Sequence, residues 1–214
     1  MPLTHDGQNL FDPGLAFGGN EWKVDEAFDT AVAGDGSIRE AIVVGIGNSA
    51  DRIYELTPTP GTRMGGGADR YLAMVVDEIK PLVDGMLRTK GGRDDTAIAG
   101  SSLGGLVSAY AGVKRPDVFG LVGVFSPSTW WDNKVIVGQV AATKGRPRPL
   151  KLYLDAGTDG DGLDDTKLLL QAYRDSGFTE GRDLQFVIQT GGRHSEVYWA
   201  QRFPGAMRFL LGPR

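Results

Sequence analysis

The segment at residues 94–112 has the residue types and spacing of a serine nucleophile. It reads DDTAIAGSSLGGLVSAYAG, and its pentapeptide GSSLG fits the pattern G-x-S-x-G, with Ser102 in the middle. In that pattern the serine occupies a sharp turn between a strand and a helix, and the glycines make room for the turn. An apolar run precedes the pentapeptide, and a helix-like run of small residues follows it. We therefore predict Ser102 as the nucleophile, with Ser101 beside it. A glycine-rich turn with incidental serines is the alternative.

This serine needs a base, because a hydroxyl is a poor nucleophile at neutral pH until an imidazole removes its proton. The chain has two histidines, and only His194 follows the serine, in TGGRHSEVYW. In hydrolases that carry this pattern, the chain order is serine, acid, histidine. The order and the position after the last apolar run predict His194 as the base.

The imidazole in turn needs a carboxylate that orients it and stabilises its charged form. The segment LDAGTDGDGLDD at 154–165 offers several aspartates. In related enzymes the carboxylate follows shortly after the glycine that corresponds to Gly157, which leaves Asp159 and Asp161. We choose Asp159, because the nearer position leaves less slack in the loop. The segment does not match the calcium-binding pattern, so we predict no metal site.

Composition indicates an ordinary globular protein. The 214 residues are 41% hydrophobic and 23% charged, which favours one domain spanning 1–214. The net charge is −4 and no basic block is present, so nucleic acid is not an expected partner. The absence of cysteine excludes disulfides and thiol catalysis. No apolar stretch reaches the ~18 residues of a membrane span, and no signal-peptide core is present, so we expect a soluble, cytoplasmic protein.

The elements that must position these residues alternate along the chain. Strands are predicted at 39–47, 95–100, 119–126, 150–157 and 184–191, and helices at 68–87, 103–115, 163–177 and 196–211. The strands are continuously apolar, as expected for parallel strands covered on both faces. The segment 57–69 is rich in proline and glycine and is predicted to be a long loop. The pattern predicts an α/β fold with a mainly parallel sheet and helices on both faces.

Further motifs resemble one enzyme family. They are HDGQNLFD (5–12), VDEAFD (24–29), IVVGIGN (42–48), DRIYELTP (51–58), ADRYLAMVVDEIKPLVD (68–84), AGSSLGGLVSAYAG (99–112), VFSPSTWW (124–131) and GGRHSEVYWAQRFP (191–204). Together they resemble the putative-esterase family, which is related to enterochelin esterase and esterase D and includes feruloyl esterases, S-formylglutathione hydrolases and mycolyltransferases.

The resemblance implies an α/β-hydrolase fold without a cofactor, with Ser102 as nucleophile and His194 as base. It further implies that the backbone amides of Gln8 and Leu103 form the oxyanion hole. The amide of Leu103 is also expected from chemistry, since it follows the nucleophile and starts a helix. His5 would belong to the oxyanion loop and be structural.

The chain departs from the family at its beginning. In the family, HDGQN follows a core strand, and further strands come before that one. Here only four residues, Met1, Pro2, Leu3 and Thr4, come before HDGQN. The resemblance thus implies a sheet that lacks the usual N-terminal strands. An open sheet edge invites pairing with another chain, so we expect a homodimer through that edge.

Trp130 and Trp131 follow the predicted strand at 119–126, at the edge of the sheet where ligands bind. We predict them as an aromatic wall for the substrate, with packing in the core as the alternative. The sequence as a whole predicts a serine carboxylesterase that hydrolyses small or short-chain esters through an acyl-enzyme. The alternatives are acyl transfer to an acceptor other than water, or a non-catalytic binding module with a hydrolase fold.

Overall fold

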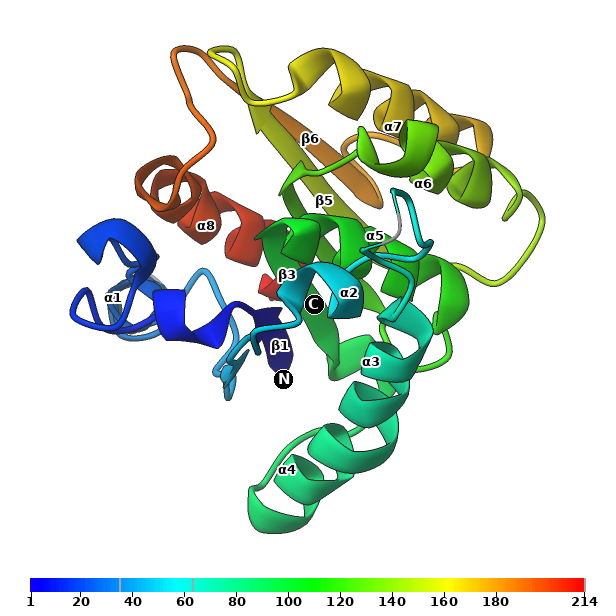
Figure 1. Cartoon of the computed structure of the whole chain (residues 1–214). Coiled ribbons are helices and arrows are strands. Elements are labelled where there is room, and N and C mark those ends of the chain that lie inside the picture. Colours follow the sequence, from blue (N-terminus) through cyan, green and yellow to red (C-terminus); the bar gives the residue numbers. More distant parts are fainter. Residues whose placement is uncertain (35, 63, 214) are drawn as a thin grey trace.

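A parallel sheet lies at the centre of the computed structural model, which describes residues 1–34, 36–62 and 64–213 (Figure 1). Among these residues, six strands pair in the order β2-β1-β3-β4-β5-β6, and every pairing is parallel. The strands are β1 (Pro2–His5), β2 (Val44–Ile46), β3 (Ala97–Ser102), β4 (Leu121–Pro127), β5 (Lys151–Gly157) and β6 (Leu184–Gln189). The predicted α/β fold with a mainly parallel sheet is confirmed.

Helices connect the strands. They are α1 (Val24–Asp29), α2 (Arg52–Glu55), α3 (Ala68–Met74), α4 (Lys80–Met86), α5 (Leu103–Lys114), α6 (Trp131–Ala141), α7 (Leu163–Asp175) and α8 (Glu196–Leu211). A π-helical turn at Val75–Ile79 joins α3 to α4, so the two form the long helix predicted at 68–87. The helices predicted at 103–115, 163–177 and 196–211 correspond to α5, α7 and α8.

Both faces of the sheet are covered by helices, as predicted. Ile98 of β3 is buried in a core with residues of α3, α5, α6 and α7. Its neighbours Ala97 and Ala99 point to the other face, where they are buried with residues of α1 and α8. Figure 1 shows this division, with α1 and α8 on one side of the strands and α3, α5, α6 and α7 on the other. Burial on both faces explains why the strands are continuously apolar in the sequence.

Some element boundaries differ from the prediction. The strand predicted at 39–47 pairs only at Val44–Ile46, because β2 lies at the edge of the sheet and its one partner, β1, has only four residues. The short elements β1, α1 and α2 were missed, since four to six residues are too few to show a period. α6 was also missed; it begins with left-handed residues at 132–134. The loop predicted at 57–69 ends at Gly67, because α3 begins at Ala68. Arg63, which falls in this loop, lies outside the described residues.

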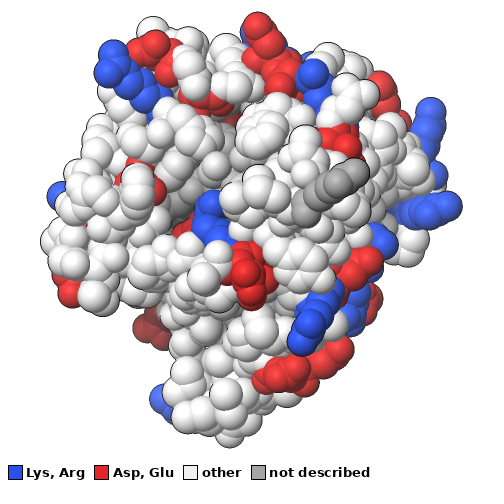
Figure 2. Space-filling model, in the orientation of Figure 1, with Lys and Arg blue, Asp and Glu red and all other residues white. Residues whose placement is uncertain are grey.

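The surface and the helices of the molecule test only some of the expectations about its partners and location. No helix in the described part of the chain is both long and apolar enough to cross a bilayer. Figure 2 shows acidic and basic side chains interspersed on the face in view. A homodimer through the β2 edge, the absence of a nucleic-acid partner and a cytoplasmic location all stay predictions.

His5, at the end of β1, is buried and structural. It is 1% exposed, and its Nδ1 lies 2.7 Å from the hydroxyl oxygen of Tyr71 on α3. Burial lowers the pKa of His5 to about 4, although the neighbouring Asp6 acts in the opposite direction. The neutral imidazole is therefore the form that the folded protein holds.

Acidification should destabilise the fold through this histidine. The pKa of His5 is lower in the folded protein than its ordinary 6.5, so the unfolded chain binds more protons, and stability is lost as the pH falls below about 6.5. Between pH 7 and pH 5 we expect a loss of about 2 kcal/mol in the free energy of unfolding from this group. Urea unfolding followed by tryptophan fluorescence at both pH values should show a smaller loss in His5→Asn than in the wild type. The same pH dependence in both proteins would contradict the assignment.

Candidate active site

The turn between β3 and α5 places Ser102 at the carboxyl end of the sheet. β3 ends at Ser102 and α5 begins at the next residue, which is the predicted context of the G-x-S-x-G pattern. Ser102 has φ 57° and ψ −119°, a conformation that costs a non-glycine residue about 1–3 kcal/mol. The turn is tight: a Cβ on Gly100 would lie 2.9 Å from the carbonyl carbon of Gly104. The strained serine is therefore a product of close contact between the strand and the helix.

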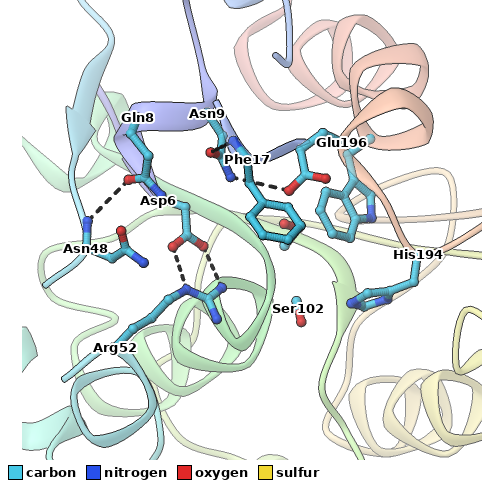
Figure 3. Close-up of a pocket in the computed structure, with 11 residues that line it drawn as sticks. Asp6, Gln8, Asn9, Phe17, Asn48, Arg52, Ser102, His194 and Glu196 are labelled. Atoms are coloured by element: carbon cyan, nitrogen blue, oxygen red, sulfur yellow. Dashed lines mark hydrogen bonds and ion pairs between the residues drawn. The ribbon is translucent and has the colours of Figure 1, made fainter. Parts of the chain in front are cut away.

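Ser102 lines a cleft with a volume of about 410 Å³ (Figure 3). The lining residues are Asp6, Gln8, Asn9, Phe17, Asn48, Arg52, Ser101, Ser102, His194, Glu196 and Trp199. In Figure 3 the His194 ring lies on one side of Ser102 and the Arg52 guanidinium on the other. The Ser102 Oγ lies 3.3 Å from the Ser128 Oγ, and no hydrogen bond joins Ser102 to His194 among the described residues. The hydrogen bond between a catalytic serine and its histidine often shortens to its full strength only when substrate binds.

His194 is held by a buried carboxylate, which belongs to Asp161. The His194 Nδ1 lies 2.7 Å from the Asp161 Oδ1, and the Asp161 side chain is fully buried while that of His194 is 38% exposed. Burial by itself raises the pKa of Asp161, but hydrogen bonds from His194, Ser126 and Gly157 outweigh burial and hold that pKa below its ordinary value. Asp161 is therefore an ionised acceptor, and it fixes the proton of the imidazole on Nδ1.

The structure does not place Asp159, the carboxylate predicted from the sequence, against His194; it places Asp161 there. The Oδ2 of Asp159 lies 2.6 Å from the Arg193 Nε, and the Asp159 side chain is 54% exposed. Gly160 and Gly162 both have positive φ and turn the chain back on itself, so that Asp161 between them points into the protein. The spacing of the aspartates along the chain does not reveal this reversal.

Of the two residues expected to form the oxyanion hole, Gln8 lines the cleft and Leu103 directly follows Ser102, which lines it. Gln8 lies in a 3₁₀ turn (Gly7–Asn9) directly after β1 and lines the cleft. Leu103 is the first residue of the 12-residue helix α5, whose amino end favours negative charge. Donation by their two amides to an oxyanion stays a prediction.

An ion pair that the sequence did not reveal supports this turn. Arg52 donates from Nε and a terminal nitrogen to the two carboxylate oxygens of Asp6, at 2.6 and 2.7 Å. Asp6 has a left-handed backbone conformation and precedes the turn that carries Gln8. The pair therefore ties α2 to the turn beside the serine. No local pattern could predict it, because the partners are 46 residues apart.

Trp130 and Trp131, predicted as an aromatic wall for the substrate, are not among the residues that line the cleft. Trp131 is 5% exposed, and its Nε1 donates to the carbonyl oxygen of Thr59 at 3.2 Å. Its ring packs so closely on Gly65 that a Cβ there would lie 2.5 Å away. Trp131 thus holds the loop at 57–67, and Trp130 is exposed outside the cleft.

Two other aromatic residues line the cleft. Phe17 is 76% exposed, and its backbone N–H donates to the Asn9 Oδ1 at 3.0 Å. Trp199 of α8 is buried and meets the His194 ring edge-on, with ring centroids 5.0 Å apart. Phe17 therefore offers an accessible apolar surface above the serine, which Figure 3 shows.

Comparison with protein families matches residues 5–210 to the family described as Putative esterase. The chain belongs to this family. It is accordingly an enzyme of the carboxylic-ester hydrolase class, and the resemblance seen in the sequence is confirmed.

Similar proteins with known names come from bacteria and fungi. Protein YbbA of Bacillus subtilis, described as uncharacterized, is 28% identical over 189 residues, which cover 81% of this chain and 74% of YbbA. The iron(III) enterobactin esterase of Escherichia coli K12 is 35% identical over 96 residues, which cover 42% of this chain and 24% of that protein. The siderophore enterobactin esterase of Emericella nidulans is 30% identical over 102 residues, which cover 42% of this chain and 34% of that protein. The matches thus span about a third and about a quarter of these two siderophore esterases.

Solved structures share the fold. The BES protein of Bacillus cereus superposes with a TM-score of 0.74 at 19% identity, over 99% of this chain and 82% of that one. The enterobactin esterase FES of Shigella flexneri, solved in the presence of enterobactin, superposes with a TM-score of 0.75 at 23% identity, over 98% of this chain and 50% of that one. The α/β-hydrolase fold predicted from the sequence is confirmed by these likenesses.

In this esterase, Asp161→Asn should abolish most of the activity, whereas Asp159→Asn should not. Replacing the carboxylate of a serine–histidine–aspartate triad by its amide lowers kcat about 10⁴-fold in a well-studied protease. Asp159 is exposed and paired with Arg193, so Asp159→Asn should change kcat less than about threefold. Initial rates on p-nitrophenyl acetate for both variants, normalised by circular dichroism for folded protein, provide the measurement. The reverse ranking would restore Asp159 as the acid.

Phe17→Ala should weaken substrate binding more than Trp130→Ala does. Both side chains are exposed, but only Phe17 lines the cleft, so truncation should raise KM for p-nitrophenyl esters by about tenfold for Phe17 and by less than twofold for Trp130. Steady-state kinetics of the two variants form a matched pair. A larger KM change in Trp130→Ala would return that residue to the substrate site.

Proposed function

We propose that this esterase hydrolyses small carboxylic esters through a triad of Ser102, His194 and Asp161 and an acyl-enzyme intermediate. The observation that carries the proposal is the strained Ser102 in the same cleft as an imidazole whose Nδ1 is bound by a buried carboxylate. That carboxylate leaves Nε2 as the ring atom free to act as base.

The reaction follows from the roles of these groups. The Nε2 of His194 removes the Ser102 proton as Oγ attacks the ester carbonyl, and Asp161 stabilises the imidazolium that forms. The amides of Leu103 and Gln8 donate to the oxyanion of the tetrahedral intermediate. The imidazolium returns its proton to the leaving alcohol, and water then releases the acyl group by the same steps.

The cleft supports a small substrate. Its volume of about 410 Å³ lies near the lower end of the range for small-molecule pockets, and it is lined by polar groups as well as by Phe17. An ester with a short acyl chain, or one bound through its alcohol at the polar side, would suit these dimensions. The named siderophore esterases among the relatives support ester hydrolysis as the chemistry.

Ser102→Ala should reduce esterase activity by several orders of magnitude, up to the ~10⁶-fold seen when a triad serine is lost. The measurement is hydrolysis of p-nitrophenyl acetate, butyrate and octanoate by the wild type and the variant, with thermal unfolding as the control for folding. The wild type should prefer acetate and butyrate. Added alcohol or sugar acceptors, followed by product analysis, separate hydrolysis from acyl transfer.

Two outcomes would contradict the proposal. A folded wild type that hydrolyses none of the three esters would favour a binding module with a hydrolase fold. Activity that rises steadily towards octanoate would leave the triad in place but would overturn the small-substrate assignment.

A further inference from the structure

A buried polar cluster surrounds the Oδ2 atom of Asp161, the carboxylate oxygen that does not contact His194. It consists of Ser126 in β4, Asp155 in β5, Asp161, and Trp199 and Arg202 in α8, and each of these residues is at most 6% exposed. The hydrolysis described above makes no use of Ser126, Asp155 or Arg202. A buried guanidinium and a second buried carboxylate are costly to maintain, so their placement needs a reason.

Arg202 lies between the two buried carboxylates. Its Nε is 3.2 Å from the Asp155 Oδ2, an ion-pair contact, and its terminal nitrogens are 3.3 and 3.4 Å from the Asp161 Oδ2. One terminal nitrogen also donates to the Ser126 Oγ at 2.7 Å. The side chain is 3% exposed, so water does not screen these contacts.

These contacts fix the direction of the Ser126 hydroxyl. Its oxygen accepts hydrogen bonds from the Trp199 Nε1 at 2.9 Å and from Arg202. A hydroxyl oxygen has two acceptor sites and one proton, so with both sites used its proton must point elsewhere. The Asp161 Oδ2 lies 2.6 Å away and receives it, alongside the Gly157 N–H at 2.5 Å. The Oδ2 is thereby satisfied, and the Oδ1 is left for His194.

The pKa values of the two carboxylates in the cluster are shifted in opposite directions. Burial raises the pKa of Asp155 to about 7, against the effect of Arg202. The pKa of Asp161 stays below its ordinary value, because its hydrogen bonds outweigh its burial. Of the two, Asp161 therefore keeps the negative charge that an imidazolium at His194 needs. Two further titratable groups contact the carboxylates: His194 contacts Asp161, and the Tyr153 hydroxyl donates to Asp155.

We propose that Arg202 is a positioning residue for the triad: together with Ser126 it holds the Asp161 Oδ2 so that the Oδ1 faces His194, and its charge balances the buried carboxylates. This inference rests on the proposed function, since it assigns Arg202 a part in the reactivity of Ser102. Arg202 does not contact the reacting atoms and acts only through Asp161.

The first test is the rate at which a fluorophosphonate probe labels Ser102, identified by mass spectrometry of the modified peptide. Arg202→Met should label about 100-fold more slowly than the wild type, less than the ~10⁴-fold fall on loss of a triad carboxylate. On p-nitrophenyl acetate the loss should appear in kcat, with KM changed less than about threefold, because Arg202 lies outside the cleft. Arg208→Met, an exposed arginine of the same helix, is the matched control and should label at the wild-type rate.

A second readout separates charge from packing. The labelling rate should fall at low pH, where His194 becomes protonated and cannot act as base. Loss of the Arg202 cation favours the protonated imidazole, so this acid limb and the NMR titration of His194 should both move to higher pH by about one unit. Arg202→Lys keeps the charge but loses the fork of donors, so its limb should stay in place while labelling slows about tenfold. With two histidines in the chain, and His5 buried, the NMR assignment is simple.

The outcomes distinguish the two proposals. A wild type that is not labelled overturns the proposed function, and the His194 titration in Arg202→Met still decides the role of Arg202. A folded Arg202→Met with the wild-type labelling rate and titration overturns the positioning role. If Arg202→Met does not fold, Ser126→Ala and Arg202→Lys decide: wild-type labelling in both would overturn it, and slower labelling at unchanged KM in both would support it.

Discussion

An ionised carboxylate, Asp161, is buried at the carboxyl end of the sheet, and the surrounding segments satisfy it. A buried charge is tolerated only where hydrogen bonds or an opposite charge replace its hydration. Here the donors to Asp161 are Ser126 from β4, the backbone of Gly157 from β5, and Arg202 from α8. Elements from three parts of the chain must meet before Asp161 can stay charged. The same requirement places His194 beside the remaining oxygen.

The parallel sheet brings these segments together at one edge. All its strands end at the same edge, so residues just after β1, β3, β5 and β6 become neighbours although they are far apart in the chain. Ser102 reaches this edge at a strained turn, and the strain is maintained because β3 and α5 are both buried in the core. The catalytic geometry is thus a consequence of packing in the two apolar cores.

The sequence predicted those features that a local pattern or the chain order determines. The glycines around Ser102 predicted the strand–helix turn in which it lies, and the chain order predicted that His194 reaches the same cleft. The apolar runs predicted the long buried strands and helices. Asp161 could not be separated from Asp159, because the direction of each side chain depends on the turns at Gly160 and Gly162, which the spacing does not encode. The Asp6–Arg52 pair and the burial of Trp131 depend on contacts between distant segments, for which one sequence gives no signal.

The two groups of cleft residues have different structural origins, and this bears on specificity. Ser102 ends β3, and Asp161 is hydrogen-bonded to the buried Ser126 and Arg202, so the positions of these two residues are tied to the core. Phe17 belongs to a short 3₁₀ segment (Phe17–Gly19) in which Gly18 and Gly19 have positive φ, and it is held to the site through the Asn9 side chain. Asn9 in turn donates to Glu196, at the start of the helix that carries Arg202. Substitution of Phe17 can reshape the mouth of the cleft at little cost to stability, because its side chain is 76% exposed, whereas a side chain at Gly18 or Gly19 would be strained. We infer that relatives with this fold can differ in the ester they accept through the segment that carries Phe17, while the buried cluster around the Asp161 Oδ2 keeps the chemistry the same.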